Sequence, residues 1–394
     1  CTFNRGLGSF ERQVALLPSI LQLANNTYQQ QYGIDLGLGS NTPGYSVESY
    51  IHGQQYVFGF QFGSTYKVNE NLAVYGGFRF NYIYNKYEGS ISNITVNING
   101  QNENLYNYLG TKADALANQA LSYQEQASNY TRLAQEATLA GNEQAAQQYA
   151  AAAEQLTKGA QLAQGGAQTL GGVRSQVADR NLDCTQRGWG ITPIIGIDYR
   201  WGKLNLGARL EFTTHLNIEN DTKVDDTGLF ADGVNTPNDI PGILTVGGCY
   251  EILPTWRVMA SYHYYFDKDA RMDKDKQKLL SSNTWEWALG SEYDISDALT
   301  VSAGMQRTKY GLGDGSYLTD MSFTTSSYSY GFGAKVRVAP KVTVEASYFW
   351  TNYETFDKEY DQEYSAAGMS ATAHNTDQFT RTNKVFGVGV NLDF

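Results

Sequence analysis

The sequence is poor in the residues that usually build metal sites or disulfide frameworks. It has three cysteines, four histidines and seven prolines, and charged residues make up only 18% of its 394 residues. Cys1, Cys184 and Cys249 have no metal-ligand spacing and form no disulfide framework, although a bond between Cys184 and Cys249 is possible in an oxidising compartment. We therefore expect no cofactor and no metal site.

Other features that the sequence lacks exclude several classes of protein. No apolar run approaches the roughly 18 residues of a transmembrane helix, and no signal peptide is visible. The net charge of −11 argues against nucleic acid, because a basic surface is needed to displace counterions. No nucleophile elbow, phosphate-binding loop or His-Glu-x-x-His motif occurs. A barrel phospholipase would need Ser and His together on its outer face, but only His52 points outward there. We expect no catalytic residue and no enzyme.

Tyrosine and glycine are abundant instead, with 29 and 40 copies, and the aromatic residues recur with a period of two. Residues 56–68 and 72–84 place apolar side chains at every second position, with Gly, Gln, Thr, Asn or Arg between them. This alternation predicts long β-strands with one apolar face. Nine more segments of this kind follow, which brings the predicted number of strands to eleven: 191–201, 204–216, 244–252, 256–266, 285–295, 299–305, 328–338, 342–350 and 386–394.

Short and long connections alternate strictly along these strands, as they do in outer-membrane barrels with periplasmic turns and extracellular loops. The polar face is then a lumen and the apolar face meets lipid, where an open sheet edge would leave backbone groups unpaired. We predict an all-β fold, a closed transmembrane antiparallel outer-membrane β-barrel. The short connections are 69–71, 202–203, 254–255, 296–298 and 339–341, and the long ones are roughly 92–186, 221–241, 267–283, 312–325 and 356–381.

Several segments resemble the outer-membrane long-chain fatty-acid transporter family, the FadL family. They are residues 2–11, 58–84, 240–247 and 262–267, together with the terminal Phe394. The resemblance implies a barrel of the 14-stranded type, an N-terminal plug and helical extracellular loops that shape an apolar entrance groove. Single-chain bacterial barrels have an even number of strands, so eleven strands indicate that the sequence is N-terminally incomplete. The plug and the first strands are expected to be missing.

The chain is expected to be a single β-barrel domain, 1–394, with a helical extracellular loop insertion at 92–186. Within it, residues 111–170 contain 17 Ala and 11 Gln with a Gly141-Asn142 break, which predicts a helical hairpin. Three roles remain open for the hairpin. It could cap the pore, dock an envelope protein partner, or be a solvated decoration.

Apolar residues in the predicted extracellular loops form a candidate ligand groove, since ligand sites are mostly apolar. The alternative is that these residues only pack the loops together. The candidates are Leu16, Leu17, Leu21, Leu23, Leu229 and Phe230.

Cationic side chains on the lumen face could neutralise a fatty-acid carboxylate through charge-assisted hydrogen bonds. Pairing with the inward Asp198, Glu211, Glu251 and Glu345 is the alternative for each of them, and His215 and His263 are more simply structural. The candidate carboxylate contacts are Arg79, Arg209, Arg257, His263, Lys335 and Arg337.

Pro193 lies inside a predicted strand and cannot donate to a β-ladder, so it implies a bulge or a local gap in the wall. Such a gap could serve lateral exit of a hydrophobic ligand, or it could be a harmless irregularity. Acidic loops around Asp225 and Asp267 could collect divalent cations that bridge to lipopolysaccharide, but they lack a complete calcium-loop pattern.

The predicted function is passive transport of hydrophobic compounds, with fatty acids implied by the resemblance, across the outer membrane of a Gram-negative bacterium. The expected partners are a hydrophobic small molecule, membrane lipid and lipopolysaccharide, with no nucleic acid. One alternative is a structural or protein-binding barrel subunit of an outer-membrane complex, with its partner at 92–186. A general diffusion porin is a further alternative.

Overall fold

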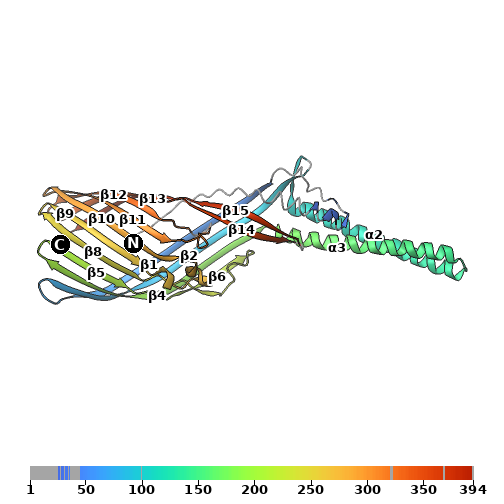
Figure 1. Cartoon of the computed structure of the whole chain (residues 1–394), viewed down its shortest axis with the longest axis horizontal. Helices are drawn as coiled ribbons and strands as arrows, with labels where there is room; N and C mark the ends of the chain where they lie inside the picture. The colour runs from blue at the N-terminus through green and yellow to red at the C-terminus, as the bar shows by residue number, and fades with distance from the viewer. Residues whose placement is uncertain are drawn as a thin grey trace.

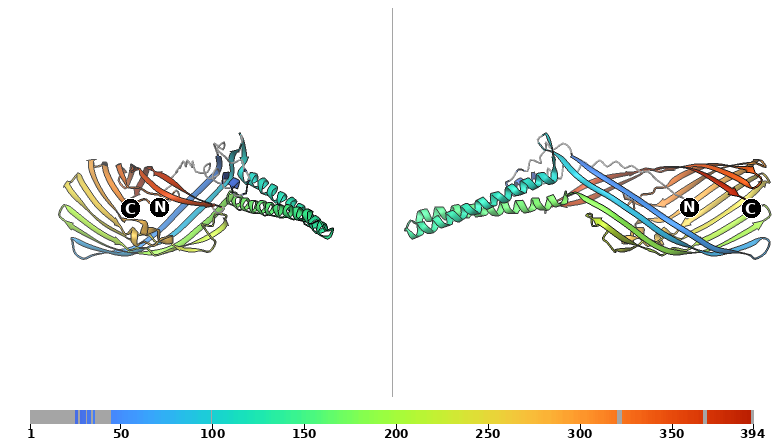
Figure 2. Two further views of the ribbon diagram at one scale, coloured as in Figure 1. Left: turned by 45° about the vertical axis from the view of Figure 1, so that its right-hand side comes forward. Right: turned by 180° about the vertical axis from the view of Figure 1, so that it is seen from behind.

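A long curved antiparallel sheet and a helical hairpin make up the molecule, and the hairpin projects from one end of the sheet (Figures 1 and 2). The computed structural model describes residues 25–26, 28–30, 32–33, 35, 45–98, 100–319, 323–366 and 369–392. The short turns lie at the end of the sheet opposite the hairpin.

Eleven strands follow one another across the sheet in the order β1-β2-β4-β5-β8-β9-β10-β11-β12-β13-β16. The predicted number of wall strands is therefore confirmed. In the described residues the sheet is open, with β1 and β16 at its two ends. The bounds are β1 Tyr45–Lys67, β2 Leu72–Ile98, β4 Arg180–Trp201, β5 Leu204–Glu211, β8 Ile243–Leu253, β9 Trp256–Tyr265, β10 Ser282–Ser296, β11 Leu299–Gly311, β12 Ser327–Ala339, β13 Val342–Tyr353 and β16 Thr382–Leu392.

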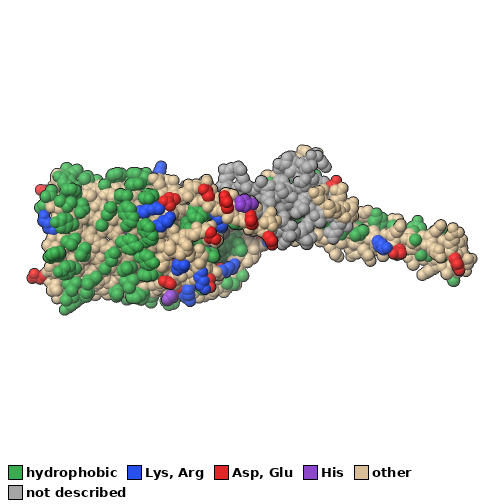
Figure 3. Space-filling model, viewed as in Figure 1, with side chains coloured by type: hydrophobic (Ala, Val, Ile, Leu, Met, Phe, Trp, Pro, Cys, Tyr) green, Lys and Arg blue, Asp and Glu red, His purple; other side chains and the backbone are tan. Residues whose placement is uncertain are grey.

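The two faces of the wall have the predicted characters. Phe60, Leu206 and Val390 remain 58%, 46% and 59% exposed, so the apolar face is not a dry core between packed layers. Hydrophobic side chains cover the part of the wall next to the short turns, and charged side chains gather nearer the hairpin (Figure 3). An apolar outer zone on a sheet of this length is the surface that meets acyl chains.

The helical hairpin was predicted correctly, although its flanking strands are longer than expected. α2 spans Leu105–Leu139 and α3 spans Glu143–Gln176. The range 92–186, expected as an insertion, also contains the end of β2, the short β3 (Gln101–Asn104) and the start of β4. Beyond Tyr84, polar residues occur on both faces of β2. The apolar alternation stops there, so the sequence pattern predicted too early an end for this strand.

Local chemistry fixes both ends of each helix. The side-chain oxygen of Asn104 accepts from the Asn107 amide at the start of α2, and Asn142 does the same for Ala145 in α3. Gly141 adopts a φ of +73° in the turn between the helices, a conformation that glycine tolerates without strain. The predicted Gly141-Asn142 break is therefore confirmed.

A hydrophobic core attaches the base of the hairpin to β2. Its fully buried members include Leu105, Leu109 and Leu170 of the helices and Val96 of β2. Ala-rich helices depend on such packing for stability. The hairpin is therefore anchored at its base and extends away from the sheet (Figure 1).

Two long connections contain strands that the sequence pattern did not reveal. β14 (Phe356–Ala366) pairs with β15 (Met369–Phe379) as a separate two-stranded sheet. β6 (Asn217–Asp225) pairs with β4 and with β7 (Asn235–Pro237). Two 3₁₀ segments, η1 (Asp267–Asp269) and η2 (Asp273–Leu279), follow β9.

No helix in the described part of the chain is both long and apolar enough to cross a membrane. Cys184 and Cys249 are both free thiols, so the possible bond between them does not form.

Candidate ligand pathway

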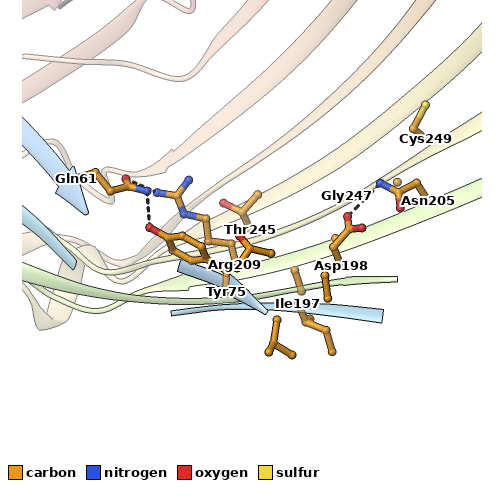
Figure 4. Close-up of a pocket in the computed structure, with 16 residues that line it drawn as sticks. Gln61, Tyr75, Ile197, Asp198, Asn205, Arg209, Thr245, Gly247 and Cys249 are labelled. Atoms are coloured by element: carbon orange, nitrogen blue, oxygen red, sulfur yellow. Dashed lines mark hydrogen bonds between the residues drawn. The ribbon is translucent and has the colours of Figure 1, made fainter. Parts of the chain in front are cut away.

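A pocket of about 520 Å³ lies on the inner face of the wall, between β1, β2, β4, β5 and β8. Polar side chains line it together with glycines and small or apolar residues (Figure 4). Those labelled there include Gln61, Tyr75, Asp198, Arg209 and Thr245. A polar inner wall of this kind fits a wet lumen.

Two of the predicted lumen cations share one carboxylate beside this pocket. The Nη1 atom of Arg79 lies 2.8 Å from Glu211, and the Nη2 atom of Arg209 lies 2.6 Å from it. Gln61 accepts a hydrogen bond from each guanidinium, at 3.0 and 3.2 Å, and donates to the Tyr75 hydroxyl at 2.9 Å. Two guanidinium groups thus share the Glu211 carboxylate, while the Asp198 carboxylate on the same pocket accepts a hydrogen bond from Asn205 at 3.1 Å.

Arg209 retains unused bonding capacity. Its Nε atom is buried and has no hydrogen-bond partner among the described residues. Buried donors in native proteins are nearly always paired. Of the predicted carboxylate contacts, Arg209 is the one whose side chain has such a buried donor without a partner among the described residues.

The remaining lumen candidates are held in the wall. Arg257 makes a bidentate pair with Asp294, at 2.8 and 2.9 Å, and a further bond to Glu292. Neither Asp294 nor Glu292 is among the inward carboxylates named above as pairing partners. His263 forms hydrogen bonds with Thr245 and Ser261 through its two ring nitrogens, as the structural alternative predicts.

Lys335 and Arg337 lie toward the short-turn end of β12, and both are exposed. Lys335 approaches Glu345 at 4.0 Å, as the pairing alternative predicts. The guanidinium of Arg337 makes no ion pair within the described part of the chain.

The wall is interrupted beside Pro193. The β4–β5 ladder ends at the pair Ile194–Glu211, and β6 rejoins β4 only at the pair Arg187–Glu219. Between these points the Phe212 amide donates to the Pro193 carbonyl at 3.0 Å, and β4 has no further ladder partner on this side among the described residues.

The gap predicted from Pro193 is therefore present, whereas a bulge against β2 is not. The β2–β4 ladder passes Pro193 in regular register, opposite Phe78. In an antiparallel ladder the N–H and C=O of one residue point to the same neighbour. An N–H group at position 193 would therefore point toward the gap, and proline has no such group. The expected single strand 204–216 was wrong, because β5 ends at Glu211.

An outward cleft of about 660 Å³ occupies this interruption. Its walls are mainly apolar and face the zone of the sheet that meets lipid. It is lined by Trp189, Gly190, Ile191, Pro193, Phe212, Thr213 and His215.

Residues 214–217 cross the inner face of β4 behind this cleft. Thr214 is fully buried and hydrogen-bonds through its hydroxyl to the inward side chains of Thr192 and Asn81. Leu216 packs with the buried Ile83 of β2. The close approach needs glycine in β4, since a Cβ at Gly190 would lie 2.7 Å from the Thr214 methyl group.

A single buried carboxylate holds the crossing segment in place. Asp239 accepts two hydrogen bonds from the Arg271 guanidinium, at 2.9 and 3.1 Å, and one from the Leu216 amide at 3.0 Å. His215 Nδ1 lies 2.9 Å from it. The Asp239 side chain is fully buried. Burial alone would raise the pKa of Asp239, but the hydrogen bonds from Arg271 and His215 outweigh burial and lower it.

The sequence did not reveal these contacts of Asp239, which we call the Asp239 clamp. No motif marks it, because its partners are 24 and 32 residues away along the chain. His215 was expected to be structural, and its bond to Asp239 confirms that role.

The loop candidates fall into three groups. Leu16, Leu17, Leu21 and Leu23 lie outside the described residues. Leu229 is 66% exposed at the surface. Phe230 stacks on Tyr87 with ring centroids 5.3 Å apart, so the structure does not bring it together with Leu229 in one groove.

The acidic loops serve mainly to fix backbone turns. Asp225 accepts hydrogen bonds from the amides of Thr227, Gly228 and Phe230, and these bonds with the one from the Thr227 hydroxyl lower its pKa. The described residues contain no cluster of three or more His, Cys, Asp or Glu side chains that could hold a metal ion.

An eleven-strand wall with an apolar outer zone, a polar inner face and short turns at one end defines an outer-membrane β-barrel. The family model described as outer membrane protein beta-barrel domain matches residues 137–394, and the chain belongs to this family. The predicted fold class and the location in the Gram-negative outer membrane are confirmed by this match.

Similar solved structures come from outer-membrane transport proteins. A Pseudomonas aeruginosa FadL homologue is 10% identical, over 89% of this chain and 75% of that chain, with a TM-score of 0.49. The P. putida toluene transporter TodX is 11% identical, over 89% and 78% of the two chains, with a TM-score of 0.40. A search of curated proteins finds no match.

Proposed function

We propose that this barrel is a passive channel for hydrophobic compounds, with long-chain fatty acids as its substrate class, and that it is not an enzyme. The observation that supports this most directly is the apolar cleft where the wall is interrupted between Pro193 and Arg187. A general porin needs no apolar opening toward lipid. A carrier of hydrophobic molecules gains a route by which its cargo avoids water.

The proposed path starts at the extracellular loops, continues through the polar lumen and ends sideways at the cleft. In the lumen, the guanidinium groups of Arg79 and Arg209 offer charge-assisted hydrogen bonds to a carboxylate head group. Movement of residues 214–217 would connect the lumen with the cleft, since this segment lies between them. No step in this path requires an energy source.

Filling the cleft tests the proposal. Thr213→Trp places a large side chain in the cleft, whereas Val246→Trp places the same side chain on the lipid-facing wall outside it. Uptake of a radiolabelled long-chain fatty acid by cells is expected to fall at least about tenfold with Thr213→Trp and to stay near normal with Val246→Trp. Heat-modifiable migration in gels verifies assembly of both variants. Equal uptake by both variants would count against the cleft as a route.

Arg209 provides a test of the substrate class. Loss of a hydrogen bond to a charged group costs about 1.5–3 kcal/mol, so Arg209→Gln is expected to weaken fatty-acid binding by roughly 10–100-fold. Binding of a fatty alcohol of the same length should change little. Lys341→Gln is the control, since Lys341 lies in the short turn between β12 and β13, outside the pocket. An equal loss for acid and alcohol would point to a structural role for Arg209.

A second candidate function rests on the hairpin. We also propose that the chain is one barrel domain with α2 and α3 as an extracellular arm for an envelope protein partner, since the arm is anchored at its base and points away from the wall. Deleting 122–159 and joining the ends with a three-residue turn would shorten the arm at the level where Tyr123 packs on Gly159. Loss of a crosslinked partner with normal fatty-acid uptake would support the arm. Loss of uptake would favour a role in gating.

A further inference from the structure

The outward face of β11, β12, β13 and β16 carries cations directly beside aromatic side chains. In the ladders Lys309 lies opposite Trp285, Arg307 lies opposite Trp287 on one side and Tyr328 on the other, and Lys384 lies opposite Trp350. All belong to the alternating set that faces away from the lumen. Trp and Tyr at such positions mark the depth of the lipid head groups.

Lys309 and Lys384 are exposed, and neither makes an ion pair within the described part of the chain. Arg307 stacks on the Tyr328 ring, 4.1 Å from its centroid, and its Nη2 atom pairs with Glu354 at 2.6 Å. The Nη1 atom of Arg307 is buried and has no hydrogen-bond partner among the described residues. Three cations with one carboxylate leave this patch, Arg307–Lys309–Lys384, positively charged in a chain of net charge −11.

Outward cations on another part of the wall are neutralised. Lys86 pairs with Glu88 at 2.6 Å, and Lys223 pairs with Asp183 at 3.3 Å. These paired lysines lie farther from the short turns than Lys309 and Lys384 do. In contrast to Lys86 and Lys223, the lysines of the Arg307–Lys309–Lys384 patch are unpaired and have aromatic neighbours.

We propose that the Arg307–Lys309–Lys384 patch binds the head group of an outer-leaflet lipid that carries more than one phosphate. Its lysines lie on β11 and β16, three strand spacings or roughly 14 Å apart across the wall, and by register Lys384 lies level with Met305, four residues or roughly 14 Å along the strand from Lys309. The two lysines are therefore roughly 20 Å apart. That separation favours two phosphate groups over one. The aromatic side chains would contact the sugar and the first carbons of the acyl chains, and the exposed Lys309 and Lys384 would contact the phosphates. Arg307 is buried and stays with Glu354. This inference does not depend on what the channel transports.

Lipid binding to the purified full chain in detergent tests the patch. The probe is bis-phosphorylated lipid A, with monophosphoryl lipid A and phosphatidylcholine as comparisons, and the readout is native mass spectrometry titration. Each cation near an anionic lipid surface contributes about fivefold in affinity. The double variant Lys309→Gln/Lys384→Gln is therefore expected to bind bis-phosphorylated lipid A about 20-fold more weakly. Wild-type protein should prefer the lipid with two phosphates over the one with a single phosphate.

Two further variants keep the result interpretable. Lys86→Gln/Lys223→Gln removes the same charge from cations that are already paired, and its affinity should stay within about twofold of wild type. Lys309→Arg/Lys384→Arg keeps the charge and should retain binding. Unchanged binding by the double glutamine variant, or an equal loss by both glutamine pairs, would overturn the proposal. So would equal affinity for phosphatidylcholine.

Discussion

Gly190→Ala should loosen the segment that crosses the inner face of β4. The new methyl group would lie 2.7 Å from the Thr214 methyl and 3.0 Å from both the His215 carbonyl oxygen and Leu216 Cβ. Thr214 cannot simply rotate away, because it is fully buried and its hydroxyl bonds Thr192 and Asn81. Overpacking of this kind costs about 1–3 kcal/mol.

That cost should appear as local opening of residues 212–217, and hydrogen exchange measured by mass spectrometry reports it. A loss of about 1–3 kcal/mol corresponds to roughly 5- to 150-fold faster exchange of these amides. The control is Gly290→Ala, another inward glycine, where the added methyl would meet nothing closer than 3.8 Å. Unaltered exchange at 212–217 in Gly190→Ala, or the same acceleration in both variants, would refute the close packing on Gly190.

Two more perturbations address the clamp and the hairpin base. Asp239 has a lowered pKa, so its stabilising contribution is complete above the ordinary Asp pKa of about 3.9 and is lost as pH falls below it. Exchange of 212–217, corrected for its intrinsic pH dependence, should be constant between about pH 7 and 5 and rise only under stronger acid. Leu170→Ala removes a side chain that is 1% exposed and should destabilise the hairpin by about 2–4 kcal/mol. Faster exchange in α2 and α3 with an intact, heat-modifiable wall is the expected result.

The wall could be predicted because apolar residues occupy every second position along its strands. Every wall strand needs an apolar outer face, so residues such as Phe60 and Val390 reveal both the strand and its orientation. The hairpin was predictable for a similar reason, since Ala-rich composition and a Gly141-Asn142 break are local signals. The length of β2 beyond Tyr84 was not predictable. Outside the lipid, the outer face of a strand no longer has to be apolar, so the alternation that marks the strand is lost.

The interruption beside Pro193 shows a different limit. The residues Leu210, Phe212 and Leu216 continue the alternation, so the sequence pattern runs through the point where β5 ends. The signal lay in the neighbouring strand, where glycine at 188 and 190 makes room for a crossing segment. Contacts between distant segments, such as those of Asp239, leave no periodic trace in a single sequence.

The pairing of lumen charges was foreseen as an alternative for each cation, and Glu211 shows why it could not be decided in advance. Glu211 pairs with both Arg79 and Arg209, whereas Arg257 pairs with Asp294 and Glu292, which were not among the predicted partners. Which inward neighbours meet depends on strand register and side-chain reach. Residue type alone does not fix either.

The half-exposed thiol of Cys249 lines the lumen pocket, while that of Cys184 is buried against the Thr222 hydroxyl. The barrel thus carries a natural attachment point for a thiol-reactive dye in its bore. In a Cys1→Ser background, a dye at Cys249 would sit within the same cavity as Arg209, without any engineered cysteine. Its emission would report directly on whether that cavity is filled with water or with an acyl chain.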